Sequence, residues 1–190
     1  MSSNREGREM ESTPPAKTIR RGPRFSTPPA KTNRRGPRFW ISAWLPVAIG
    51  IGVIALESTV WLGADHTSSP LRFLFEAIFG PVSDARWDVI HHMIRKCGHF
   101  TGYGLLGLVW LRAWWMTLAL RVSGFWTPAV LGFAGTALVA SWDEWHQTYL
   151  PNRTGSPWDV LLDCCGAVTA LLVVYAFVRI FRQEKLRRAA

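Results

Sequence analysis

Long apolar segments alternate with shorter polar ones from residue 40 to the end of the chain. The apolar segments lie at residues 40–63, 98–120, 124–142 and 157–180, and each is rich in aliphatic and aromatic side chains. An α-helix rises about 1.5 Å per residue, so that roughly 20 apolar residues cover the hydrocarbon core of a bilayer. The pattern therefore predicts an all-α fold, a polytopic membrane bundle of four transmembrane helices.

The polar segment that follows the first apolar one contains amphipathic stretches too short to span a bilayer. In residues 70–80, apolar side chains recur at i, i+3, i+4, i+7 and i+8 from Leu71, which places them on one face of a helix. Arg72 and Glu76 are four residues apart on another face, where they can pair. Residues 84–96 divide in a similar way. We therefore expect one or two short interfacial helices in this first outer loop.

Glycine spacing predicts where the helices pack closely. Gly98 and Gly102 are four residues apart, and Gly132 and Gly135 lie close together in the next apolar segment. Small residues at such spacing allow two helix backbones to approach each other in a membrane. We expect a close helix crossing at each pair.

The basic residues predict the orientation of the bundle. Of the 22 Lys and Arg residues, 10 precede Trp40 and 5 lie from Arg179 onward, so the net charge of +9 belongs mainly to the tails and does not indicate a nucleic-acid partner. With both termini inside, 17 basic residues are cytoplasmic and 5 lie in the outer loops. Basic residues concentrate on the cytoplasmic side of membrane proteins. The sequence therefore predicts a multi-pass protein of the inner or plasma membrane, with both termini cytoplasmic and residues 64–96 and 143–156 outside.

Composition divides the chain into three parts. Residues 1–39 contain a 14-residue tandem repeat, STPPAKTIRRGPRF followed by STPPAKTNRRGPRF, which is rich in Pro and Arg and poor in aliphatic side chains. Such a segment buries too little apolar surface to fold, and we expect a disordered basic cytoplasmic arm. The arm either rests on anionic lipid or is a neutral duplication. Residues 40–181 are predicted to form the transmembrane domain and residues 182–190 a basic cytoplasmic tail.

Two clusters of polar residues lie at the edges of the apolar segments, at residues 95–103 and 141–166. A charged side chain inside a membrane costs about 2.5–3.5 kcal/mol, so a dense group of such residues indicates a functional site. Helical spacing places these residues in three stripes: Lys96, His99 and Tyr103; Glu144 and Gln147; and Asp159, Asp163 and Gly166. The predicted topology brings all three stripes to the outer side, where we expect them to form one site.

Some polar residues near these clusters allow a structural interpretation as well as a functional one. Glu57 is either a carboxylate that reaches the interface or a partner for a buried base. Ser156 precedes Pro157 and Asp159, which is a variant of the capping box that begins a helix. Part of the role of Asp159 is therefore structural, whereas Asp163, one turn deeper, is not explained by capping.

The spacing of these residues resembles that of the VanZ-like membrane proteins over residues 40–180. The motifs are Lys96-x-x-His99-x-x-x-Tyr103, Glu144-x-x-Gln147, Pro151-x-Arg153 and Asp159-x-x-x-Asp163-x-x-Gly166. The resemblance implies that these residues form the family's site, and it implies a link to low-level resistance against the glycopeptide teicoplanin. Many relatives differ from this chain in having Asn in place of Asp163 or Glu in place of Gly102.

Three functions remain open for this site. It binds the phosphate of an anionic lipid or lipid-linked cell-wall precursor, because Arg and Lys are strong phosphate donors. Alternatively, it is an enzyme, a hydrolase or transferase on lipid phosphates at the outer leaflet, with His99, Asp159 or Asp163 in catalysis. In the third alternative the polar residues only satisfy one another as buried ion pairs. The ligand-binding candidates are Arg95, Lys96, His99, Tyr103, Glu144, Gln147, Arg153, Asp159 and Asp163.

The histidines and carboxylates supply enough ligands for a metal site, but we expect no metal and no cofactor. The 5 histidines lie among carboxylates, but none has the H-x3-H or H-E-x-x-H spacing typical of zinc sites. The 3 cysteines, Cys97, Cys164 and Cys165, have no spacing typical of a disulfide framework or zinc knuckle. We therefore expect the membrane, with an anionic lipid or lipid-linked precursor, to be the partner.

Overall fold

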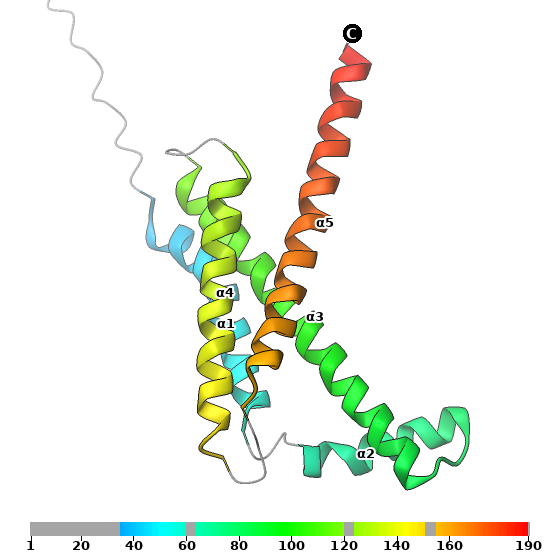
Figure 1. Ribbon diagram of the computed structural model, residues 1–190. Helices are drawn as coiled ribbons and strands as arrows, with labels where there is room; N and C mark the ends of the chain where they lie inside the picture. Colours follow the sequence, from blue (N-terminus) through cyan, green and yellow to red (C-terminus); the bar gives the residue numbers. More distant parts are fainter. Residues whose placement is uncertain (1–34, 60–63, 120–123, 151–154, 190) are drawn as a thin grey trace, which may run out of the picture. The chain divides into compact units, whose positions relative to one another are not determined.

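The computed structural model describes residues 35–59, 64–119, 124–150 and 155–189. Residues 1–34, which hold most of the predicted disordered arm, lie outside the described residues, and the described residues all belong to one compact unit, Arg35–Ala190. Every regular element among them is a helix, which confirms the all-α class (Figure 1). The helices are α1 (Pro37–Glu57), α2 (Ala64–Phe79), α3 (Asp84–Leu118), α4 (Trp126–Gln147) and α5 (Pro157–Ala189).

Three helices are longer than the sequence pattern predicts. The stretches expected at residues 84–96 and 98–120 form one continuous helix, α3. Gly98 costs a helix about 1 kcal/mol but does not end it, and no proline separates the two stretches. Helix α2 begins before Pro70 and includes it, although proline removes one helical hydrogen bond. Helix α5 continues to Ala189, so the basic tail is its last part.

Helix α3 is the central element of the bundle, since α1, α2, α4 and α5 all contact it. One buried apolar cluster contains Ile54 of α1, Tyr103 and Leu106 of α3 and Ala140 of α4. A second cluster, formed by Leu111, Phe125, Ala129 and Leu171, joins α3 to the beginning of α4 and the middle of α5. These contacts pack α1, α4 and α5 against α3.

Glycines on α3 and α5 allow these two helices to approach closely. A Cβ atom at Gly104 would lie 3.2 Å from the carbonyl oxygen of Gly166, and one at Gly107 would lie 3.3 Å from the Cβ of Ala167. The expected crossing at Gly98 and Gly102 is wrong, because no atom of another described helix lies within 4 Å of a Cβ placed at either residue. The close approach of α3 to α5 runs from the Phe100 carbonyl through Gly104 to Gly107, so it uses other residues of α3 than the predicted glycine pair.

The second expected glycine crossing is present. A Cβ at Gly132 would lie 3.1 Å from the backbone nitrogen of Leu111, and one at Gly135 would lie 2.8 Å from the ring of Trp110. The missing side chains therefore let α4 pack against α3, as the spacing of these two glycines predicts.

Helix α2 is attached to the first half of α3 by polar contacts. The predicted pair forms, with Arg72 Nε 2.9 Å from Glu76 Oε1, and Arg72 also donates to Asp84 Oδ1 at 2.7 Å. The indole of Trp87 donates to the Ser68 hydroxyl at 2.7 Å. Among the described residues, α3 is the helix that α2 contacts.

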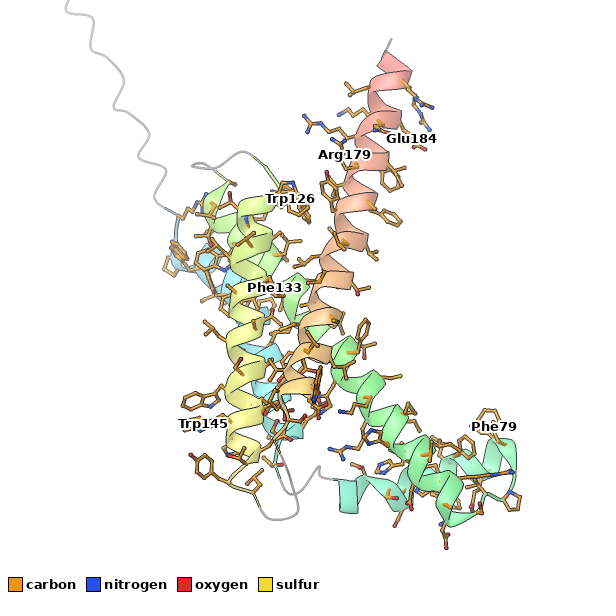
Figure 2. All side chains as sticks on the ribbon, viewed as in Figure 1. Phe79, Trp126, Phe133, Trp145, Arg179 and Glu184 are labelled. Carbon is orange, nitrogen blue, oxygen red and sulfur yellow. The ribbon has the colours of Figure 1, made fainter. Side chains whose placement is uncertain are left out.

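Two of the helices are long and apolar enough to cross a membrane, judged by length and composition. They are α1 and residues Pro157–Arg188 of α5. Only 17% and 22% of their apolar windows are buried inside the protein, so most of each window faces outward. Large apolar side chains are also exposed on the other helices, and Figure 2 shows Phe79, Trp126 and Trp145 projecting from the ribbon. Large apolar side chains exposed on several helices are typical of a surface that contacts lipid.

The two ends of the bundle differ in their polar contacts. Helix α5 begins at the end where α1 and α4 finish, and the first half of α3 lies there as well (Figure 1). At the opposite end, Arg35 donates to the carbonyls of Met116 and Thr117, each at 2.7 Å, and so satisfies the C-terminus of α3. Arg112 donates to the Ser42 carbonyl at 2.7 Å.

Candidate functional site

Asp143 lies at the centre of a buried polar cluster where α1, α3 and α4 meet. Its Oδ2 accepts hydrogen bonds from the Tyr103 hydroxyl and the Gln147 amide, both at 3.1 Å, and its Oδ1 accepts one from the Ser58 hydroxyl. All four side chains are buried. Asp143 and Gln147 are four residues apart and therefore share a face of α4. These donors hold the Asp143 carboxylate in one orientation.

His99 and Asp163 form a second part of this cluster, between α3 and α5. His99 Nδ1 lies 3.5 Å from Asp163 Oδ1, and the Asp163 side chain is completely buried. Neither His99 Nδ1 nor either Asp163 oxygen has a hydrogen-bond partner among the described residues. The His99 ring also stacks on Tyr103, with centroids 6.2 Å apart. The pair therefore lies beside the Asp143 cluster, with hydrogen-bonding capacity that the described side chains do not use.

Three successive contacts align α3 with α5. Lys96 forms an ion pair with Asp159, His99 faces Asp163, and the Phe100 carbonyl contacts Gly166. On α5 the three positions are those of the predicted stripe, at i, i+4 and i+7, and on α3 Lys96 lies three residues before His99 and four before Phe100. The stripes of α3 and α5 thus face each other.

Glu144 connects the end of α4 to the beginning of α5. Its Oε2 accepts a hydrogen bond of 2.7 Å from the backbone N–H of Ser156. The Ser156 hydroxyl accepts one of 3.2 Å from the N–H of Trp158. In a capping box, the acidic residue three positions later would bind the Ser156 N–H. Here Glu144 takes that place, which leaves Asp159 for Lys96.

A pocket of about 450 Å³ opens beside Glu144, between the last turn of α4 and the first turn of α5. Pro157, Val160 and Trp145 make much of its lining apolar, and Glu144 and Ser156 add polar atoms. This volume is within the usual range for small-molecule sites, about 300–1,000 Å³. The pocket therefore gives access to one edge of the polar cluster.

The structure brings most of the predicted site residues together at one end of the bundle. Arg95 is half-buried and forms no ion pair with a described side chain. Arg153 lies outside the described residues. The predicted residues that meet there are Lys96, His99, Tyr103, Glu144, Gln147, Asp159 and Asp163.

Two residues of the cluster were not among the predicted site residues. Asp143 would have been indicated by its position four residues before Gln147 on one helix face. Ser58 has no comparable signal, because it follows the last residue of α1. Its neighbour Glu57, considered as a partner for a buried base, has an exposed side chain.

These features define a membrane-associated helical protein with a buried polar site at one end of its bundle. A model of the VanZ/LLP1 family matches residues 43–181, and the chain belongs to that family. The match confirms the resemblance to VanZ-like proteins that the motifs carry. Comparisons with curated proteins and with solved structures found no match.

Proposed function

We propose that the protein crosses the membrane four times, through α1, α3, α4 and α5, with both termini cytoplasmic and the polar site on the outer side. Two observations support this topology. Each of the four helices exposes large apolar side chains, including Leu105 of α3 and Leu138 of α4. The end of the bundle opposite the site carries Arg35 and Arg112, and an excess of basic residues marks the cytoplasmic side.

We propose that the site binds the phosphate-bearing head of an anionic lipid or a lipid-linked cell-wall precursor. Arg95 is the residue we assign to the phosphate, because it is half-buried, precedes Lys96 on α3 and has no ion-pair partner among the described side chains. Lys96 adds a second positive charge, shared with Asp159. The pocket between α4 and α5 is apolar enough to take the first part of a lipid chain.

The unsatisfied atoms of His99 and Asp163 favour a ligand site over a purely structural cluster. Polar residues that serve only packing satisfy one another, and more than about 90% of buried polar groups have a partner. Here a completely buried carboxylate has no hydrogen bond from a described residue. This observation carries the proposal, because hydroxyl donors of a bound head group would supply the missing partners of the carboxylate, with the phosphate itself held by Arg95 and Lys96.

Binding can be tested with the full chain in nanodiscs that contain phosphatidylglycerol, phosphatidylcholine or a polyisoprenyl phosphate. We expect the wild-type chain to retain the anionic species through native mass spectrometry, and the R95Q variant to lose at least tenfold in affinity without a change in melting temperature. R86Q is the matched control, because Arg86 is an exposed arginine of the same helix. Equal retention by R95Q and wild type would exclude this role of Arg95.

Resistance is a cellular test of the same proposal. If the site binds a lipid-linked cell-wall precursor, expression of the chain in a susceptible Gram-positive host should lower sensitivity to teicoplanin. R95Q should abolish the effect and R86Q should preserve it. A loss of phosphatidylglycerol binding without any change in sensitivity would assign the site to membrane lipid instead of the precursor.

A hydrolase or transferase acting on lipid phosphates is the second candidate function, and the His99–Asp163 pair favours it. A carboxylate 3.5 Å from an imidazole nitrogen can orient the ring as a general base or acid. Incubation with a polyisoprenyl diphosphate would release inorganic phosphate if this function is correct, and H99Q would abolish the release. Binding without turnover in the wild type would leave binding as the function of the site.

A further inference from the structure

His99, Asp143 and Glu144 bring three metal-ligating side chains together. One ligand atom from each residue lies within 4.8 Å of the other two. Asp143 and Glu144 are buried, and His99 is half-buried. Metals such as Zn²⁺ are held by imidazole nitrogen and carboxylate oxygen at about 2.0–2.2 Å, so bound ligand atoms lie roughly 3–4 Å apart. Small side-chain rotations would bring these three atoms to that separation.

Each of the three side chains has a further partner that fixes its orientation. His99 faces Asp163, Glu144 accepts from the Ser156 N–H, and Asp143 accepts from Tyr103 and Gln147. Metal-ligating histidines usually donate their second ring nitrogen to a carboxylate, and ligating carboxylates are themselves hydrogen-bonded. With His99 Nδ1 toward Asp163, the Nε2 atom is left as the metal-ligating one.

The charge of the cluster supplies an independent argument for a cation. Asp143, Glu144 and Asp163 are three buried carboxylates, and His99 is the basic group among them. Lys96, the nearest lysine along α3, forms its ion pair with Asp159. Asp163 is completely buried, with neither oxygen hydrogen-bonded by a described residue. Buried charges require a compensating charge or a metal.

We propose that His99, Asp143 and Glu144 bind a divalent transition-metal ion, with Asp163 as a positioning residue behind His99. Imidazole nitrogen favours Zn²⁺ over Mg²⁺ and Ca²⁺, and carboxylate oxygen is also compatible with Mn²⁺. Three protein ligands leave at least one coordination position for water or a ligand oxygen. The ligands come from two helices, α3 and α4, and are far apart in the sequence. They therefore form no short zinc motif, and the sequence alone led to the expectation of no metal.

The metal site stands on side-chain geometry and does not rest on lipid binding. If both are correct, the ion would offset the carboxylates that otherwise repel a phosphate, and its open position would accept a phosphate oxygen. A chain that binds metal but no anionic lipid would support this inference and contradict the proposed function. A chain that binds anionic lipid but no metal would contradict this inference and support the proposed function.

The test uses the untagged full chain in detergent, stripped with a chelator and dialysed against Zn²⁺, Mn²⁺ or Mg²⁺. We expect one Zn²⁺ or Mn²⁺ per chain by elemental mass spectrometry, a higher melting temperature with the metal, and no retention of Mg²⁺. The H99Q and E144Q variants should lose at least tenfold in affinity. H92A and D88N are the controls, since His92 and Asp88 are exposed on α3.

The positioning role of Asp163 is tested by a measurement that a change in packing alone would not alter. The visible absorption of bound Co²⁺ reports the geometry of the ligands. D163N should shift these bands and weaken metal binding by about 10–100-fold, as loss of a partner behind a ligating histidine does. Fewer than one ion per ten wild-type chains would overturn the proposal without any variant, and so would unchanged affinity in a folded E144Q variant.

Discussion

Gly166 of α5 lies directly against the main-chain carbonyl of Phe100 in α3, where a Cβ atom would collide with the carbonyl oxygen. The same short stretch of α3 carries His99, and the same face of α5 carries Asp163. The distance between these two side chains is therefore set by how closely the two backbones approach at Gly166.

Replacing this glycine should separate the two helices. We expect G166A to destabilise the protein by about 1–3 kcal/mol, because overpacking of a tight contact costs this much. Unfolding by heat or denaturant in detergent measures the effect. G102A is the control: no atom of another described helix lies within 4 Å of its added Cβ, and alanine favours a helix by up to about 1 kcal/mol. If G166A were as stable as G102A, the close contact would be wrong.

The Lys96–Asp159 pair should contribute to the stability of the α3–α5 contact. The two side chains are 30% and 28% exposed, between a surface pair and a buried one. Residues of one ion pair show coupling energies of about 0.5–3 kcal/mol in double-mutant cycles. We therefore expect K96Q and D159N each to destabilise the fold, and the double variant to cost less than their sum. Strict additivity would mean that the pair contributes no coupling energy.

Acid should weaken the contact between α2 and α3 through His91. This ring is 7% exposed and stacks on Trp87 at 5.6 Å, and its Nε2 lies 3.3 Å from the Thr67 hydroxyl. Burial lowers the pKa of His91 below its ordinary value of 6.5, Arg95 adds to the effect, and Asp88 opposes it. The folded state therefore favours the neutral ring.

The sign of the pH effect follows from this lowered pKa. The contribution of the neutral His91 ring to stability is fully present above pH 6.5. It declines as the pH falls below 6.5 toward the pKa of His91 in the folded state. The protection factors of the α2 amides, which correct for the intrinsic pH dependence of exchange, should decrease over this interval. H91Q should remove the dependence, whereas H92Q should retain it because His92 is exposed. If H91Q and the wild type show the same pH dependence, another titrating group causes the effect.

Helical periodicity alone was enough to predict which residues of the site share a face. Lys96, His99 and Tyr103 line one side of α3, and Asp159 and Asp163 line one side of α5, because both helices are regular there. The facing of the stripes followed from the predicted topology. This part of the site depends only on spacing, and spacing is visible in a sequence.

The remaining parts of the site depend on helix rotation and on where helices end. Asp143 and Glu144 are adjacent, and periodicity does not decide which of them turns inward; in the structure both are buried. Ser58 reaches Asp143 because α1 ends one residue earlier. Gly104, and not Gly102, lies at the close contact with α5. The point where α3 and α5 cross depends on the packing of the whole bundle, which spacing in the sequence does not show.

Four membrane crossings should place residues 119 and 149 on opposite sides of the membrane. Ala119 follows the end of α3, and Tyr149 follows the end of α4 at the site end of the bundle. After replacing Cys97, Cys164 and Cys165 by serine, single cysteines would be introduced as A119C, Y149C and L186C. An impermeant maleimide should label Y149C in intact cells, and A119C and L186C only after permeabilisation. These positions test two of the four crossings, because α4 joins the first to the second and α5 joins the second to the third. Labelling of A119C and Y149C from the same side would show that α4 does not cross, and the four-helix topology would then be wrong.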